Sequence, residues 1–166
     1  MKKIVLALGV FGFIAIATSA FAASQNQNLT VNMAISARAK LTLGVGAINF
    51  ADADPDSTPS ISATENPVSV TAKVRTGAAS TATLTHLAGG DLTSGGSVIP
   101  IANVTWTATG GGYAAAGTMN KTAAQSVGSW TGSGTYVGTV SYSIVNSWSY
   151  TTGNYSVSTT FTLTAP

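Results

Sequence analysis

Apolar and polar side chains alternate along much of the chain after residue 28, which is the pattern of a β-strand with one buried face. The clearest alternation predicts strands at 29–37, 68–74, 136–144 and 155–163. Shorter candidates are 47–50, 81–87, 98–109 and 112–119. Turn-forming residues separate them, namely Asp54-Pro55-Asp56 and glycine-rich stretches at 89–90, 95–96, 110–112 and 132–134. This pattern predicts an all-β fold, an antiparallel β-sandwich of about 7–9 strands.

A small outer-membrane barrel is the competing architecture, because it too consists of short alternating strands. Such barrels carry girdles of aromatic residues and an alternation in segments of roughly ten residues throughout the chain. Here Phe50 is the single aromatic residue between positions 23 and 94, and the chain ends in Pro166, where bacterial barrels usually have an aromatic residue. The sandwich is therefore the favoured prediction.

The first 22 residues have the three parts of a secretory signal peptide. Lys2-Lys3 precede an uncharged apolar run at 4–18, and Ala20-Phe21-Ala22 supplies the small residues of a cleavage site. We expect cleavage after residue 22, which leaves a single domain at 23–166. The alternative is an uncleaved membrane anchor, but a polar run follows at once at 24–28. The mature chain has no second apolar run of spanning length, so we expect a secreted or cell-surface protein, with periplasmic transit in a Gram-negative host.

Composition narrows the functional classes. The 166 residues carry a formal charge of +2, but two of the seven basic residues are Lys2 and Lys3, so the mature chain is neutral. A neutral domain with few charges lacks the excess of basic residues that nucleic-acid binding requires. The chain has no cysteine, one histidine and five acidic residues. This composition favours a protein that is not an enzyme and uses no cofactor.

Two patterns suggest metal or catalytic chemistry. Asp52, Asp54 and Asp56 alternate in one loop, and three carboxylates with this spacing can converge on calcium. Ser57 and Ala63 stand where an EF-hand needs glycine and glutamate, so a solvated turn is the favoured interpretation. His86 lies in a predicted strand, and no Gly-x-Ser-x-Gly motif accompanies it. The favoured interpretation of His86 is a structural strand residue.

Aromatic residues concentrate in the second half of the chain. Trp130 lies between glycine-rich turns, and Trp148 and Tyr150 share a strand parity near Gly153. Exposed aromatic rings can stack on sugars or anchor a protein interface. These three residues are therefore the candidate ligand or interface aromatics.

Three stretches resemble the spore coat protein U family and the related alternate-chaperone pilins. These are the opening segment 28–35, Ala47-Ile48-Asn49-Phe50 followed by an acidic loop, and the closing segment 153–164 with its Gly-x-Tyr start. The resemblance implies an immunoglobulin-like sandwich used as a secreted or fimbrial structural subunit. A periplasmic chaperone is a further partner that such a subunit would use.

The opening segment provides the candidate assembly strand, whose apolar positions are Leu29, Val31, Met33 and Ile35. A strand this close to a terminus can pair within its own sheet or complete the sheet of a neighbouring copy. We therefore predict an exported structural subunit of a pilus, filament or coat, which forms homo-oligomers through β-strand edges. The alternative is a secreted carbohydrate-binding or adhesin module that binds glycans through exposed tryptophans.

Overall fold

The computed structural model describes residues 24–166, so the predicted signal peptide lies outside the described residues. The described residues divide into two units, 24–33 and 34–166. In the first unit, residues 24–33 form no helix or strand, and their side chains are exposed. Within the described range, no helix has the length and apolar character needed to cross a membrane.

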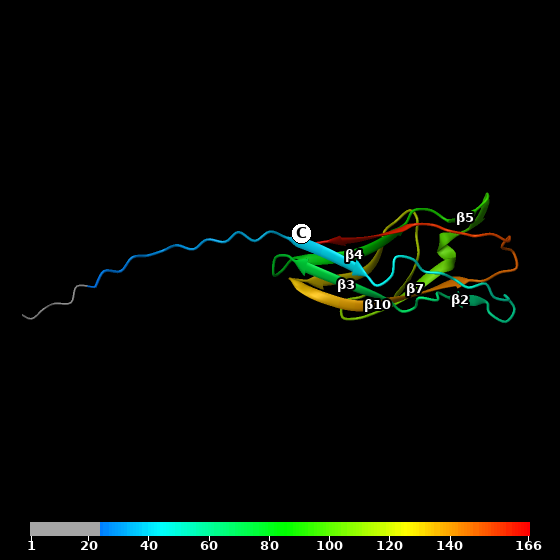
Figure 1. The fold of residues 1–166 in the computed structure, drawn as a ribbon, viewed down its shortest axis with the longest axis horizontal. Helices are drawn as coiled ribbons and strands as arrows, with labels where there is room; N and C mark the ends of the chain where they lie inside the picture. Colours follow the sequence, from blue (N-terminus) through cyan, green and yellow to red (C-terminus); the bar gives the residue numbers. More distant parts are fainter. Residues whose placement is uncertain (1–23) are drawn as a thin grey trace, which may run out of the picture. The chain divides into compact units, whose positions relative to one another are not determined.

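The second unit is almost entirely β-structure (Figure 1). One short 3-10 helix, Ile101–Asn103, precedes the seventh strand. Residues 34–166 contain eleven strands: β1 (Arg38–Leu43), β2 (Ser60–Ser62), β3 (Val68–Arg75), β4 (Thr81–Ala88), β5 (Leu92–Ser94), β6 (Ser97–Ile99), β7 (Val104–Thr109), β8 (Ala116–Thr118), β9 (Gln125–Thr131), β10 (Gly134–Val145) and β11 (Thr159–Thr164).

These strands form two main antiparallel sheets. The larger sheet has the order β1-β3-β10-β7-β8, with β2 also paired to β10, and the smaller one has the order β11-β4-β9. A separate hairpin joins β5 to β6. The predicted all-β, antiparallel sandwich is confirmed. Four of the eleven strands have only three residues, which is why the sequence pattern indicated fewer.

The core is formed by the inward-facing positions of both sheets. In β3 the buried side chains alternate with outward ones, as the sequence pattern requires, and β4 and β10 behave in the same way. Trp106 on β7 lies over Gly117 on β8, where an added Cβ would stand 2.4 Å from the indole ring. A glycine at this cross-strand position therefore provides the space in which a core tryptophan packs.

Several sequence predictions differ from the observed strands. The segment 29–37 is not a strand of this subunit, and the first strand, β1, begins one residue after it. Residues 47–50 contain only an isolated bridge between Phe50 and Ala63. The range 98–109 divides into β6, the short helix and β7. The pattern also missed β9, because Gly128 and a register shift opposite Leu84 interrupt its alternation.

Candidate functional site

The candidate assembly strand is unpaired in this structure. Among its alternating apolar side chains, Leu29 is 88% exposed, Val31 84%, Met33 80% and Ile35 62%. Large apolar groups at this exposure contribute little to the stability of the subunit that carries them, and full burial of such a side chain is worth about 1.5–3 kcal/mol. The segment therefore has a strand-like sequence and no partner strand within residues 24–166.

One lateral side of the sandwich is closed by main-chain hydrogen bonds between the two sheets. The loop after β7 reaches β9, where Ser129 N donates to Gly112 O over 2.8 Å and Ala114 N donates to Val127 O over 2.9 Å. Trp130 Nε1 also donates to Gly111 O over 2.7 Å. The loop thus extends strand pairing across this side of the molecule.

The opposite side of the sandwich is not closed in this way. It is formed by β1 and β11, which are edge strands of different sheets and lie close to each other. Within the part of the chain that the structure describes, no ladder or main-chain hydrogen bond joins β1 to β11. We call this side the β1–β11 seam. Each strand there has one edge whose N–H and C=O groups lack a neighbouring strand.

Apolar side chains of the seam are only partly covered. Leu41 on β1, and Phe161 and Leu163 on β11, pack against the core yet remain half-exposed. Leu43, at the end of β1, is 36% exposed. Two sheet edges with incompletely buried apolar residues are the usual features of a site for β-strand addition. Sequence analysis missed β1 because its alternation appeared to belong to the preceding segment.

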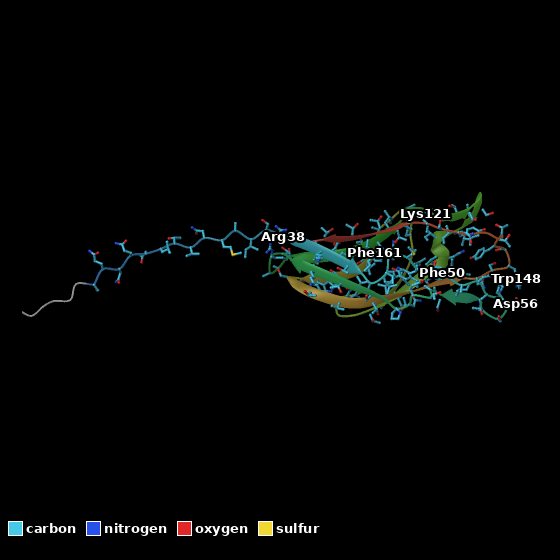
Figure 2. All side chains as sticks on the ribbon, in the orientation of Figure 1. Arg38, Phe50, Asp56, Lys121, Trp148 and Phe161 are labelled. Atoms are coloured by element: carbon cyan, nitrogen blue, oxygen red, sulfur yellow. The ribbon has the colours of Figure 1, made fainter. Side chains whose placement is uncertain are left out.

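The acidic loop lies at one end of the sandwich, as the label on Asp56 shows in Figure 2. Asp54 accepts a hydrogen bond from Asp56 N over 2.9 Å, and its carbonyl accepts one from Thr58 N over 2.8 Å. Among residues 24–166, no three acidic or histidine side chains come close enough to hold a metal ion. The geometry therefore gives no support to a calcium site, and Asp54 instead stabilises a turn.

The candidate aromatics separate into buried and exposed residues. Trp130 is only 5% exposed and stacks on Tyr136, with 4.8 Å between ring centroids. Trp130 is therefore not an exposed ligand-binding aromatic as predicted, because its side chain packs in the core. Tyr150 is half-buried, and its hydroxyl accepts a hydrogen bond from Asn103 Nδ2 over 2.8 Å.

Trp148 is the exposed member of the set, with 69% of its surface accessible. Its Nε1 donates to Asp56 Oδ1 over 3.0 Å. The structure thus brings together an aromatic candidate and an acidic-loop candidate that the sequence separates by 92 positions. Figure 2 shows both at the same end of the molecule.

His86 is fully buried in β4. Its ring meets Trp106 and Phe161 edge-on, with 5.4 Å between centroids in each case. Among the described residues, neither ring nitrogen has a hydrogen-bond partner, and burial lowers the pKa of His86 from 6.5 to about 4. Without a nucleophile or an orienting carboxylate bonded to it, His86 has the environment of a neutral core residue.

The Asn49-Phe50 pair is held at the start of the acidic loop by Glu65. The Glu65 carboxylate accepts bonds from Asn49 N and Asn49 Nδ2, each over 2.7 Å, and these bonds lower its pKa. These two hydrogen bonds tie Glu65 to the segment just before the acidic loop, across 16 positions of the chain.

Comparison with known proteins gave no match: no family model, curated protein or solved structure is detectably similar to this chain.

Proposed function

We propose that the mature chain is an exported structural subunit of a surface filament or coat, and that residues 28–37 of one copy add a strand to the β1–β11 seam of the next. The observation that carries this proposal is a pair of complementary features on one chain. A strand-like segment exposes its alternating apolar residues, while the outer edges of β1 and β11 have no neighbouring strand within residues 24–166. Strand addition would bury these apolar side chains and provide hydrogen-bond partners for the unpaired strand edges.

The dimensions of the two partners agree. The apolar positions from Leu29 to Ile35 extend over six residue steps, which is about 20 Å at roughly 3.3 Å per residue. β1 and β11 each have six residues and so have a similar length. An added strand can therefore follow either edge along its whole length.

Pairing with a neighbouring copy is favoured over pairing with the same copy. The segment leads directly into β1, so it would need a tight turn to fold back along the seam of its own subunit. Residues 34–37, Ala-Ile-Ser-Ala, contain no glycine, proline, asparagine or aspartate, and Ser36 is the one residue there of a type that favours turns, more weakly than those four. Arg75 Nε also donates to Ser36 O over 2.9 Å, which holds the entry to β1 in place. Repeated head to tail, the contact between copies produces a fibre.

The test uses the full mature chain with single substitutions in the segment. Val31→Asp places a charge on the apolar face, and Asn32→Asp places the same charge on the polar face. Because both residues are exposed in the subunit, neither should change its melting temperature. We expect Val31→Asp to lower the assembly rate at least about tenfold, from the lost burial and the cost of burying a charge, while Asn32→Asp assembles normally. Light scattering and electron microscopy measure the outcome.

A free peptide of residues 28–37 provides the second measurement. It should bind the Val31→Asp variant, raise its melting temperature and shift the tryptophan fluorescence of the subunit. Equal assembly of the two variants, or failure of the peptide to bind, would contradict strand addition.

A second candidate function rests on Trp148 alone. Its exposed indole, fixed by Asp56, is the kind of surface that stacks on a sugar ring. A glycan-binding role predicts that the mature chain binds a glycan array and that Trp148→Phe retains more binding than Trp148→Ala. The resemblance to alternate-chaperone pilins favours the first candidate, the filament or coat subunit. For such a subunit, a periplasmic chaperone would cover the β1–β11 seam before assembly.

A further inference from the structure

Four basic residues form a compact group on the outer face of the larger sheet. The register of β1 and β3 places Arg38 opposite Arg75 and Lys40 opposite Lys73. All four side chains are exposed and point away from the core, because the intervening residues of β3 are the buried ones. We call this group the basic quartet.

The quartet is unusual in a chain with so few charges. The fifth basic residue of the described part, Lys121, pairs with Asp91, and this is the only ion pair among residues 24–166. Like charges directly opposite each other on neighbouring strands destabilise a sheet. The arrangement therefore lowers the stability of the isolated subunit. This cost suggests that the four charges serve a contact with another molecule.

The complementary charge lies at the other end of the sandwich. Asp52, Asp54 and Asp56 are exposed in one loop, and none of them has an ion-pair partner within residues 24–166. Figure 2 shows Arg38 near one end of the long axis of the sandwich and Asp56 near the opposite end. Charge is thus separated along the unit 34–166, with four positive groups at one end and three negative groups at the other.

From this arrangement we infer that the basic quartet of one copy docks on the acidic loop of a second copy. The inference rests on the proposed function, since it describes the contact that accompanies strand addition. Residues 28–37 directly precede Arg38 in the chain, so the segment that enters a neighbour starts beside the quartet. The charges bring the correct ends together before the strand pairs, and they disfavour head-to-head encounters.

The first experiment uses the natural mature chain and a zero-length carbodiimide cross-linker. This reagent joins a lysine amine to a carboxylate in direct contact. Because the quartet and the loop lie at opposite ends of one copy, a cross-link between Lys40 or Lys73 and the acidic loop must connect two copies. We expect such cross-links in assembling protein at about 20 mM salt, and fewer at 300 mM, where screening is strong. Assembly without any of them would overturn the inference.

The second experiment compares variants matched in net charge. Lys40→Gln with Lys73→Gln removes two positive charges from the quartet, and Ser129→Glu with Thr131→Glu adds two negative charges on the exposed face of β9. We expect the first variant to assemble about fivefold more slowly at low salt, in line with electrostatic steering, and the second to keep the natural rate. An acidic-end variant, Asp52→Asn with Asp56→Asn, should assemble as slowly at low salt as the first variant.

Further outcomes show whether the quartet binds a membrane instead, and whether the docking of the ends or the strand addition is the part that fails. If the acidic-end variant assembles normally and the natural chain sediments with phosphatidylserine vesicles, the quartet faces a membrane and the inference is wrong. The peptide of residues 28–37 reports on strand addition separately, because it lacks the quartet. Normal peptide binding with charge-independent assembly refutes only the docking of the ends, whereas charge-dependent association without peptide binding refutes only strand addition.

Discussion

Acidification should destabilise this domain at an unusually high pH because of one residue, His86. The side chain is fully buried between Trp106 and Phe161 and has no hydrogen-bond partner among the described residues. Burial lowers the pKa of His86 to about 4, whereas the unfolded chain has the ordinary value of 6.5. Above pH 6.5 the histidine is neutral in both states and has no effect. Between pH 6.5 and 4 only the unfolded state takes up the proton, so stability decreases as the pH falls.

The size of the effect follows from the two pKa values. Each unit of difference corresponds to about 1.4 kcal/mol, so the full loss is about 3 kcal/mol by pH 4 and about 2 kcal/mol already by pH 5. Hydrogen bonds from Asn49 and from Lys121 lower the pKa values of Glu65 and Asp91, respectively. Their contributions are present above the unfolded carboxyl pKa of about 4 and disappear only below it. The range from pH 6.5 to 5 therefore reports on His86.

The assay is urea unfolding at several pH values between 7.5 and 5, followed by tryptophan fluorescence. The Val31→Asp background keeps the protein monomeric if strand addition drives assembly. We expect the free energy of unfolding to fall by about 2 kcal/mol from pH 6.5 to 5. His86→Leu, which keeps an apolar side chain of similar volume, should remove this slope. A flat profile for natural His86, or the same slope in His86→Leu, would refute the reasoning.

Three further predictions concern packing and metal. Gly117→Ala should lower stability by about 1–3 kcal/mol in thermal unfolding, because the new Cβ would stand 2.4 Å from the Trp106 ring; an unchanged melting temperature would contradict the close packing of this pair. Trp130→Ala should cost about 3–5 kcal/mol and Trp148→Ala less than about 0.5 kcal/mol, so similar losses would contradict their different burial. Calcium and chelator should leave the melting temperature unchanged, and a rise of several degrees with calcium would restore a metal role for the acidic loop.

The sequence predicted the central strands well because their local pattern matches their final environment. β3, β4 and β10 each bury one face and expose the other, so alternation alone located them. The pattern failed at β9, where a register shift and Gly128 break the alternation. For the same reason it could not assign Trp130 to the core.

The sequence pattern predicted the assembly strand but not the β1–β11 seam to which it is proposed to bind. The alternation of Leu29, Val31, Met33 and Ile35 is a local property, and from it the sequence predicts a segment suited to strand pairing. Whether that segment has a partner in its own subunit depends on which edges the sheets leave unpaired. Those edges, β1 and β11, lie at opposite ends of the chain.

The sequence by itself determined an all-β antiparallel domain, because side-chain alternation and turn residues act over a few positions. Only the tertiary structure decided what depends on long-range register. It placed four positive side chains opposite one another across β1 and β3 and joined Trp148 to Asp56. It also buried His86 with no hydrogen-bond partner among residues 24–166. Each of these features involves residues that are distant in the chain. Their proximity is set by the packing of the whole sandwich, which a local pattern of apolar and polar positions does not specify.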